Sequence, residues 1–225
     1  MNFAKWPLFE KVWLISFTLI GAWLCQRWGD TAFGYSVMLS GIICVVLVAR
    51  GSIWNYPIGI YNTSAYSWLA WQNGFYGELA LNAMYYNIMQ IWGWWAWKDK
   101  IEEGVVKPQK MTSMQITQWG IIVAEATLIL GYILSQLPGQ NTPWMDSTST
   151  VFAVIAMYLM VKRYREQWLL WISLDVINII MWSLRLSSGV EGAMSMTVMW
   201  SAFLINAVYG YYKWSKYATV EPVTK

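Results

Sequence analysis

Long apolar segments alternate along the chain with short stretches that hold most of its charged residues. An α-helix needs about 20 apolar residues to cross a bilayer core of about 30 Å. By this measure the pattern predicts eight transmembrane helices, over 12–28, 33–49, 53–71, 75–97, 119–137, 148–161, 168–188 and 193–214. The sixth segment is short and the third is polar for a membrane helix, so both assignments depend partly on the charge pattern.

Basic residues gather on one side of the predicted spans. With eight spans, all but two of the 15 lysines and arginines (Arg27 and Arg185) lie in segments that share a side. Because cytoplasmic loops carry an excess of Lys and Arg, both termini and the long loop at about 98–118 are expected in the cytoplasm. A seven-span arrangement would place basic residues on both sides, so eight spans are preferred. The tail after Tyr217 is expected to lack regular structure.

Tryptophan spacing suggests an internal repeat. Trp54 and Trp68 are 14 residues apart, as are Trp168 and Trp182, and Gly93-Trp94-Trp95-Ala96-Trp97 resembles Gly210-Tyr211-Tyr212-Lys213-Trp214. In this alignment Trp168 corresponds to Trp54, and Trp171 stands where the first repeat has Pro57. Both repeats would begin on the same side of the membrane, which makes them parallel repeats with a binding site between them near the midplane.

The fold prediction is therefore an all-α integral membrane protein with an extra N-terminal helix and a 3+1+3 core of two parallel three-helix repeats. Its predicted parts are the extra helix (1–32), the first repeat (33–97), a cytoplasmic loop with a linker helix (98–147), the second repeat (148–216) and a cytoplasmic tail (217–225).

Composition agrees with a membrane protein and excludes several activities. Charged residues make up 12% of the chain, against roughly 25% in soluble domains, while 57% of residues are hydrophobic and 17% aromatic. The absence of histidine removes His-based catalysis and most catalytic zinc sites. An intramembrane aspartyl protease needs two aspartates in spans, and only Asp175 qualifies. We therefore expect no enzyme, no metal or cofactor, and no nucleic-acid partner.

Polar residues at membrane depth are costly, so each needs a partner, a cavity or a ligand. In the third span Asn62 follows Asn55 by seven residues on one helical face, with Pro57 and Gly59 between them. Pro57 should kink this helix, and Gly59 is grouped with it as a gating or kink position. Neighbouring helices could satisfy the kink, or it could contact a ligand directly; the sequence leaves both open.

Further polar residues lie on three other predicted spans. The fourth span contains Asn82, Tyr86, Asn87 and Gln90. The seventh contains Asp175, Asn178 and Trp182, and the eighth contains Asn206. Interhelical hydrogen bonds would account for one or two such groups, but amides on several helices favour a lined cavity. Amides suit a carboxamide or sugar hydroxyls, and aromatic faces suit a flat, even cationic, ring. Asp175 could balance a positive ring or orient hydroxyls. The predicted solute is small, flat and hydroxylated.

These residues resemble the PnuC family of bacterial nicotinamide riboside transporters. The resemblance rests on the run from Asn55 to Asn62, on Tyr76-Gly77-Glu78, on Gln90-Ile91-Trp92-Gly93-Trp94, and on Trp168-Leu169-Leu170-Trp171-Ile172-Ser173-Leu174-Asp175, over about residues 33–216. It implies an architecture like that of SWEET transporters in a bacterial inner membrane. It also implies facilitated diffusion of nicotinamide riboside, which a cytoplasmic kinase would trap by phosphorylation. Gln90, Asn87, Asn178, Asp175 and Trp182 are the ligand residues that it favours.

Two alternatives stay open at this point. The chain could carry another vitamin or nucleoside, such as thiamine, riboflavin or a deoxynucleoside, because similar amides and aromatics would suit each. It could also be a membrane receptor that binds without moving solute. A homo-oligomer is expected, with a trimer as the working guess.

Overall fold

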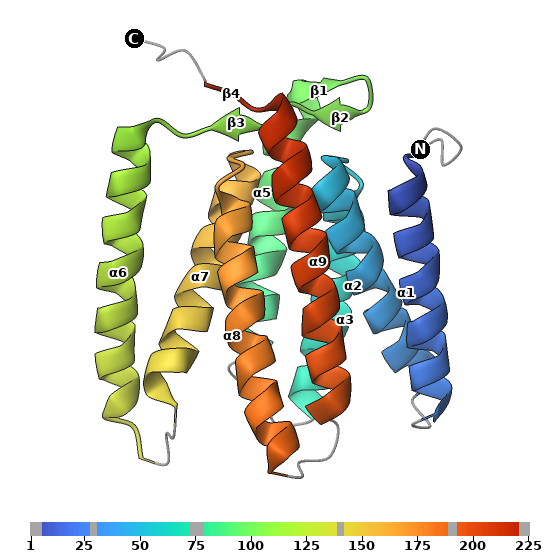
Figure 1. The fold of residues 1–225 in the computed structure, drawn as a ribbon, viewed down its shortest axis with the longest axis vertical. Helices are drawn as coiled ribbons and strands as arrows, with labels where there is room; N and C mark the ends of the chain where they lie inside the picture. The colour runs from blue at the N-terminus through green and yellow to red at the C-terminus, as the bar shows by residue number, and fades with distance from the viewer. Residues whose placement is uncertain (1–5, 28–30, 73–78, 139–141, 189–192, 221–225) are drawn as a thin grey trace. The chain divides into compact units, whose positions relative to one another are not determined.

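The computed structural model describes residues 6–27, 31–72, 79–138, 142–188 and 193–220. The chain forms two compact units, Met1–Lys107 and Pro108–Lys225. Within the described ranges, helices lie at all eight positions where the sequence predicts a span (Figure 1). The predicted all-α class is confirmed.

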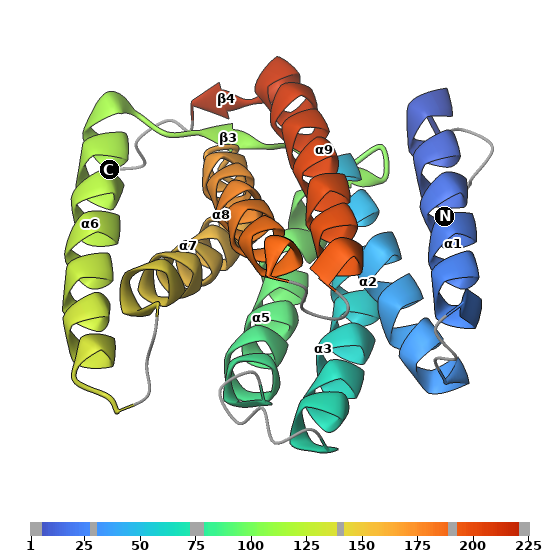
Figure 2. The ribbon, with the colours of Figure 1, turned by 60° about the horizontal axis from the view of Figure 1, so that its bottom comes forward.

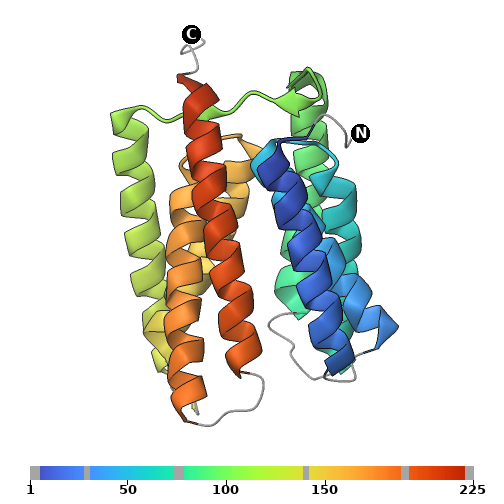
Figure 3. The same ribbon diagram turned by 45° about the vertical axis from the view of Figure 1, so that its right-hand side comes forward.

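The first unit is a series of helices in which each packs against the next. It contains α1 (Leu8–Arg27), α2 (Ala32–Arg50), α3 (Asn55–Gln72), a π-helical turn η2 (Leu81–Tyr86) continuing into α5 (Asn87–Trp97), a 3-10 turn η3 (Lys98–Lys100), and strands β1 (Ile101–Glu102) and β2 (Val105–Val106). Helix α1 packs on α2, α2 on α3, and α3 on η2 and α5 (Figure 3). The Tyr76-Gly77-Glu78 segment lies outside the described residues.

The second unit repeats this serial packing. It contains β3 (Gln109–Lys110), α6 (Ser113–Ser135), α7 (Pro143–Val161), α8 (Gln167–Ser187), α9 (Ala193–Tyr217) and β4 (Thr219–Val220). Helix α6 packs on α7, α7 on α8, and α8 on α9, which run side by side in Figures 1 and 2.

Several predicted boundaries move because of local features at the helix ends. Helix α6 begins at Ser113, before the predicted start at 119, because Thr112 and Gln115 form a capping box. Helix α7 begins at Pro143 rather than 148, since a proline is favoured in the first helical turn. The loop at 98–118 contains short strands, and β4 pairs in parallel with β3. The expectation of an unstructured tail is therefore wrong for the residues of β4.

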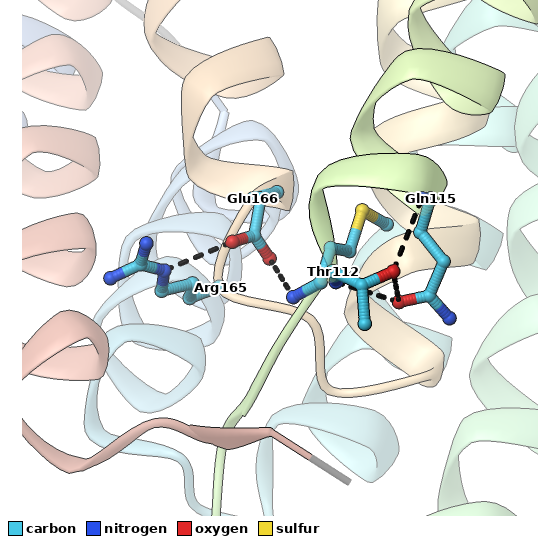
Figure 4. A network of polar contacts seen from close by, with 5 residues as sticks. Thr112, Gln115, Arg165 and Glu166 are labelled. Atoms are coloured by element: carbon cyan, nitrogen blue, oxygen red, sulfur yellow. Dashed lines mark hydrogen bonds and ion pairs between the residues drawn. The ribbon is translucent and has the colours of Figure 1, made fainter. Parts of the chain in front are cut away.

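A polar network fixes the start of α6 against the turn between α7 and α8 (Figure 4). The buried Glu166 carboxylate accepts the Met111 N–H at 3.2 Å and the Arg165 Nε–H at 3.0 Å. The Gln109 N–H donates to the carbonyl of Arg163 at 2.7 Å, and Arg165 N–H donates back to Gln109 at 2.9 Å. This turn and the segment before α6 are therefore one hydrogen-bonded element.

The same backbone turn occurs once in each unit, 112 residues apart. After α2, Gly51 has a φ of 77° and donates to Val48, and Ser52 donates to Leu47. After α7, Arg163 has a φ of 63° and donates to Met160, while Tyr164 donates to Leu159. Both turns are thus Schellman-type helix ends with one left-handed residue.

An aromatic ring packed on a glycine follows each of these turns. In the first unit Tyr56 of α3 lies so close to Gly93 of α5 that an added Cβ would be 2.1 Å from its ring, and Tyr56 meets Trp97 edge-on at 4.9 Å. In the second unit the corresponding contacts join Trp168, Gly210 and Trp214: the Cβ distance would be 2.5 Å, and the edge-on ring separation is 5.8 Å. The recurrence supports an internal repeat between 33–97 and 148–216.

The contacts also correct the alignment between the repeats. Trp168 matches Tyr56 rather than Trp54, and Leu169 rather than Trp171 takes the position of Pro57. The alignment based on tryptophan spacing was wrong because a chain with 18 tryptophans offers several pairs with similar spacing. The ring that packs on the glycine defines the correspondence.

The outer surfaces of the helices are apolar, as a bilayer requires. Four of the described helices are long and apolar enough to cross a membrane: Ala32–Arg50, Ser113–Ser135, Pro143–Val161 and Gln167–Leu184. On α6 the large side chains Ile121, Ile122, Leu128 and Ile129 are all exposed. Such a surface is unfavourable in water and favourable in lipid.

A buried ion pair holds the extra helix α1 against α2. Arg50 Nη1 lies 2.8 Å from Glu10 Oε2, and the Glu10 side chain is only 1% exposed. The Arg50 guanidinium also lies over the Trp6 ring at 4.7 Å. Helix α1 is therefore attached through charge as well as through apolar packing.

Gly93→Ala tests the aromatic–glycine contact. We expect a loss of roughly 1–3 kcal/mol of stability, because the new methyl group would overlap the Tyr56 ring. The measurement is the thermal unfolding midpoint in detergent. Gly120→Ala on α6, where no atom lies within 4 Å of the added Cβ, is the control and should not destabilise. Equal midpoints for the two variants would contradict the contact.

Glu10→Gln tests the attachment of α1. Removing the charge leaves Arg50 partly buried and unpaired, which should cost roughly 2 kcal/mol and lower the unfolding midpoint. The control is Glu102→Gln, which removes the exposed partner of Lys107 and should change the midpoint little. Similar shifts of the unfolding midpoint in both variants would show that the buried Glu10–Arg50 pair stabilises the protein no more than an exposed pair does.

Candidate functional site

Three pairs of residues define the contact between α3 and α5. Going along α3, the aromatic Tyr56 faces Gly93, then Gly59 faces Gln90, and then Thr63 meets Asn87. The α3 residues are three or four apart, so they form one stripe along the helix. Two predicted ligand residues, Gln90 and Asn87, therefore lie against small side chains of the neighbouring helix.

A π-helical turn directly precedes these amides. The Asn87 N–H donates to the carbonyl of Asn82, five residues back, instead of four. Such single π turns insert an extra residue into a helix and are frequent at functional sites. Asn82 and Gln90 are both buried within the unit, while the Tyr86 ring lies beside that of Tyr85 at 5.5 Å. The sequence offered no signal for this turn, because nothing in Leu81–Tyr86 distinguishes a π-helical turn from an α-helical one.

Polar atoms of the first unit remain available for a ligand. The buried Oε1 of Gln90 has no hydrogen-bond partner among the described residues. The Oδ1 of Asn87 accepts from the hydroxyls of Thr63 and Ser64. That bonding directs the Asn87 amide nitrogen elsewhere, and no described residue accepts from it. One acceptor and one donor are thus free on neighbouring turns of α5.

The second unit provides a free carboxylate. Asp175 of α8 is 4% exposed, and within the described ranges no donor bonds to it. By the 112-residue correspondence it occupies the position of Thr63, whose hydroxyl is used within the first unit. An unpaired buried carboxylate is strongly unfavourable without a counter-charge or a donor. Asp175 therefore fits a site for a cation or for hydroxyl donors.

The other predicted residues of this unit have varied surroundings. Asn178 donates through Nδ2 to the carbonyl of Leu174 at 2.9 Å, which leaves its Oδ1 free of that bond. Trp182 is half-buried on α8, and Asn206 of α9 is 4% exposed. Their contact with a ligand remains a prediction.

Two residues of α3 differ from expectation. Asn62 donates through Nδ2 to the Val37 carbonyl at 2.7 Å and to the Ser40 hydroxyl at 3.1 Å, so this nitrogen joins α3 to α2. Pro57 falls in the first turn of α3 and not in its interior. Its missing N–H would have no helical partner there, so the expected kink has no cause.

Sequence reasoning missed Thr63 and Ser64, because small hydroxyl residues in a helix carry no distinctive signal. It also treated Gly59 as a gating position. In the structure Gly59 makes room for Gln90, since an added Cβ would lie 2.3 Å from the Gln90 Nε2. Chemically, the described groups can accept an amide N–H, donate to a carbonyl or hydroxyl oxygen, and balance a positive charge.

Comparison with known proteins shows extended similarity to one family. The model of the nicotinamide mononucleotide transporter family matches residues 31–216. The chain is 31% identical to a nicotinamide riboside transporter PnuC of Neisseria mucosa, over 95% of this chain and 83% of the relative. It is 32% identical to the PnuC of Haemophilus influenzae, over 94% and 91%.

A solved structure and a more distant relative extend this similarity. A crystal structure of the vitamin B3 transporter PnuC superposes with a TM-score of 0.77 at 31% identity, covering 95% of this chain and 93% of that chain. A riboflavin/roseoflavin transporter RibM of Streptomyces davaonensis is 26% identical over 62% of this chain and 66% of its own length.

Proposed function

We propose that this chain, which belongs to the nicotinamide mononucleotide transporter family, is a membrane transporter of nicotinamide riboside. The family is one of transporters, and we propose that this chain is a transporter and not an enzyme. Its role is to bind a small solute at membrane depth and release it on the other side.

The observation that carries this proposal is a set of polar groups that have no hydrogen-bond partner in the described part of the chain. Nicotinamide riboside has a positively charged pyridinium ring, a carboxamide and ribose hydroxyls. The Asp175 carboxylate suits the cation or the hydroxyls, the Gln90 Oε1 suits an N–H donor, and the Asn87 nitrogen suits a carbonyl or hydroxyl oxygen. Buried groups of this kind discriminate strongly because a wrong ligand leaves them unpaired.

The charges favour the riboside over the mononucleotide. The segments 82–90 and 175–182 contain neither lysine nor arginine. A phosphate group would have no cation to pair with in these segments and would be repelled by Asp175. Similarity to a riboflavin transporter keeps riboflavin as a second candidate, but riboflavin lacks the positive ring that would neutralise Asp175.

We infer facilitated diffusion as the mode of transport. A cytoplasmic kinase would phosphorylate the substrate after entry. Because 82–90 and 175–182 contain no basic residue to pair with a phosphate, the phosphorylated product would bind poorly and stay in the cell. The charged product is then a poor substrate for the return path, which makes accumulation possible without coupling to an ion gradient.

The expected orientation has support in both units. In the first, Arg50 and Lys107 lie near the turn at Gly51, to which Val106 N–H donates at 2.9 Å. In the second, Lys162 and Arg165 flank the equivalent turn at Arg163. We therefore assign these ends to the cytoplasm, with both termini inside and the protein in the bacterial inner membrane.

A homo-oligomer, with a trimer as the working hypothesis, fits the surface of α6. Glu125 is exposed in the middle of this apolar helix. A carboxylate facing lipid costs about 3 kcal/mol, and contact with a second copy would cover it.

The substrate assignment predicts saturable binding of nicotinamide riboside to the purified protein. Tryptophan fluorescence or calorimetric titration would compare it with nicotinamide, nicotinamide mononucleotide, thiamine and riboflavin. Asp175→Asn should weaken nicotinamide riboside binding at least tenfold, because the counter-charge is lost. Saturable binding of another vitamin without binding of nicotinamide riboside would refute the assignment. Counterflow in liposomes then separates a transporter from a receptor, since a receptor does not exchange solute.

Gly59→Ala should weaken binding while the fold survives. The added methyl group overlaps only the end of the flexible Gln90 side chain, which can rotate away and leave its binding position. We expect roughly tenfold weaker binding of nicotinamide riboside and a smaller loss of thermal stability than for Gly93→Ala. If Gly59→Ala binds as the wild type does, Gln90 at this position does not contribute to the site.

A further inference from the structure

We propose that Thr63, together with Ser64, is a positioning residue that holds the Asn87 side-chain amide with its oxygen toward α3 and its nitrogen toward the substrate. This inference rests on the proposed function, because it assumes that Asn87 contacts the ligand. The inference assigns a role in ligand binding to hydroxyl side chains of a helix, which act on the ligand through another side chain.

The geometry places two hydroxyls on one amide oxygen. The buried Thr63 Oγ1 makes a short hydrogen bond to Asn87 Oδ1, and the exposed Ser64 Oγ donates to the same oxygen at 3.3 Å. Consecutive residues of α3 therefore hold one amide between them. Because both bonds go to Oδ1, the nitrogen on the other side of the planar amide faces away from α3.

The single hydroxyl proton of Thr63 has three possible acceptors among the described residues: Asn87 Oδ1, the carbonyl of Gly59, and the carbonyl of Ile60 at 3.4 Å. Its Oγ1 also lies 2.8 Å from the carbonyl of Gly59, one turn earlier in α3. That carbonyl is already the acceptor for the Thr63 N–H in the regular helix, so it does not need the hydroxyl. The proton can therefore go to Asn87 without leaving the carbonyl unpaired.

The orientation of this amide determines what the site can recognise. With Oδ1 held, Asn87 offers an N–H donor and requires an oxygen acceptor on the ligand, such as the carboxamide carbonyl or a ribose hydroxyl. A rotated amide would offer an acceptor and would require a donor instead. In the second unit the equivalent position holds Asp175, so the same place in the fold holds a bonded hydroxyl in one unit and, among the described residues, a carboxyl without a donor in the other.

The first test removes each hydroxyl in turn. Thr63→Val keeps the shape of the side chain, and we expect its Kd for nicotinamide riboside to rise roughly tenfold, the ratio that corresponds to one hydrogen bond of about 1.4 kcal/mol. Thr63→Ser restores the hydroxyl and should bind within about twofold of the wild type. Ser64→Ala, at an exposed position that does not endanger folding, should weaken binding roughly twofold.

The matched control is Ser67→Ala. Ser67 is also buried on α3, one turn further along, but its hydroxyl donates to the Thr63 carbonyl within its own helix. Its loss should leave the Kd unchanged even if stability falls slightly. A purely structural role for buried hydroxyls on α3 would instead weaken binding in Thr63→Val and Ser67→Ala alike.

A double-mutant cycle separates positioning from packing. In an Asn87→Ala background, Thr63→Val should cause no further loss of affinity, because its effect passes through Asn87. Additive losses, or wild-type affinity in both Thr63→Val and Ser64→Ala, would overturn the inference. If the wild type itself does not bind nicotinamide riboside, the proposed substrate fails, and the same cycle is run with the vitamin that the binding panel identifies.

Discussion

The close approach of an aromatic ring to a glycine governs the arrangement of helices in each unit. Tyr56 on Gly93, and Trp168 on Gly210, occupy the space that a side chain would otherwise fill. These contacts fix the distance and register between the second and third helices of each repeat. Once Tyr56 is opposite Gly93, Gln90 is placed against Gly59 and Asn87 against Thr63. The position of the Gln90 and Asn87 amides therefore follows from a packing contact between two residues, Tyr56 and Gly93, that are not candidate ligand residues.

Polar groups in these helices fall into two classes. Some are bonded within the fold, as Asn62 is to α2 and the Thr63 hydroxyl is to Asn87. Others, such as the Gln90 Oε1 and the Asp175 carboxylate, lack partners among the described residues. Because an unpaired polar group costs several kcal/mol away from water, the second class identifies the groups that a ligand or water must satisfy. The distinction between bonded and unpaired groups identifies candidate ligand-binding residues better than the number of polar residues on each helix does.

The two units share a backbone turn and the aromatic ring that follows it, but they differ at the neighbouring polar positions. The turns at Gly51 and Arg163, and the rings of Tyr56 and Trp168 that follow them, coincide after a shift of 112 residues, whereas the glycines on which these rings pack, Gly93 and Gly210, are 117 residues apart. By the 112-residue shift Thr63 corresponds to Asp175, and Gly59 corresponds to Trp171. The proposed substrate, with a charged ring, a carboxamide and a sugar, is itself asymmetric, and such divergence agrees with the proposed site.

Apolar periodicity and the distribution of basic residues determined the membrane class and the eight helical segments from the sequence alone, and a few short motifs carried the family resemblance. The membrane class and the helical segments depend on the composition of one helix at a time, and the bilayer imposes them on each helix separately. The candidate residues Gln90 and Asp175 were also apparent, because an amide or a carboxylate in an apolar run is conspicuous. Only the tertiary structure decided the pairing of Asn87 with Thr63, the commitment of Asn62 to α2 and the alignment of the repeats. Each depends on which side chains meet across two helices, and spacing along one helix does not contain that information.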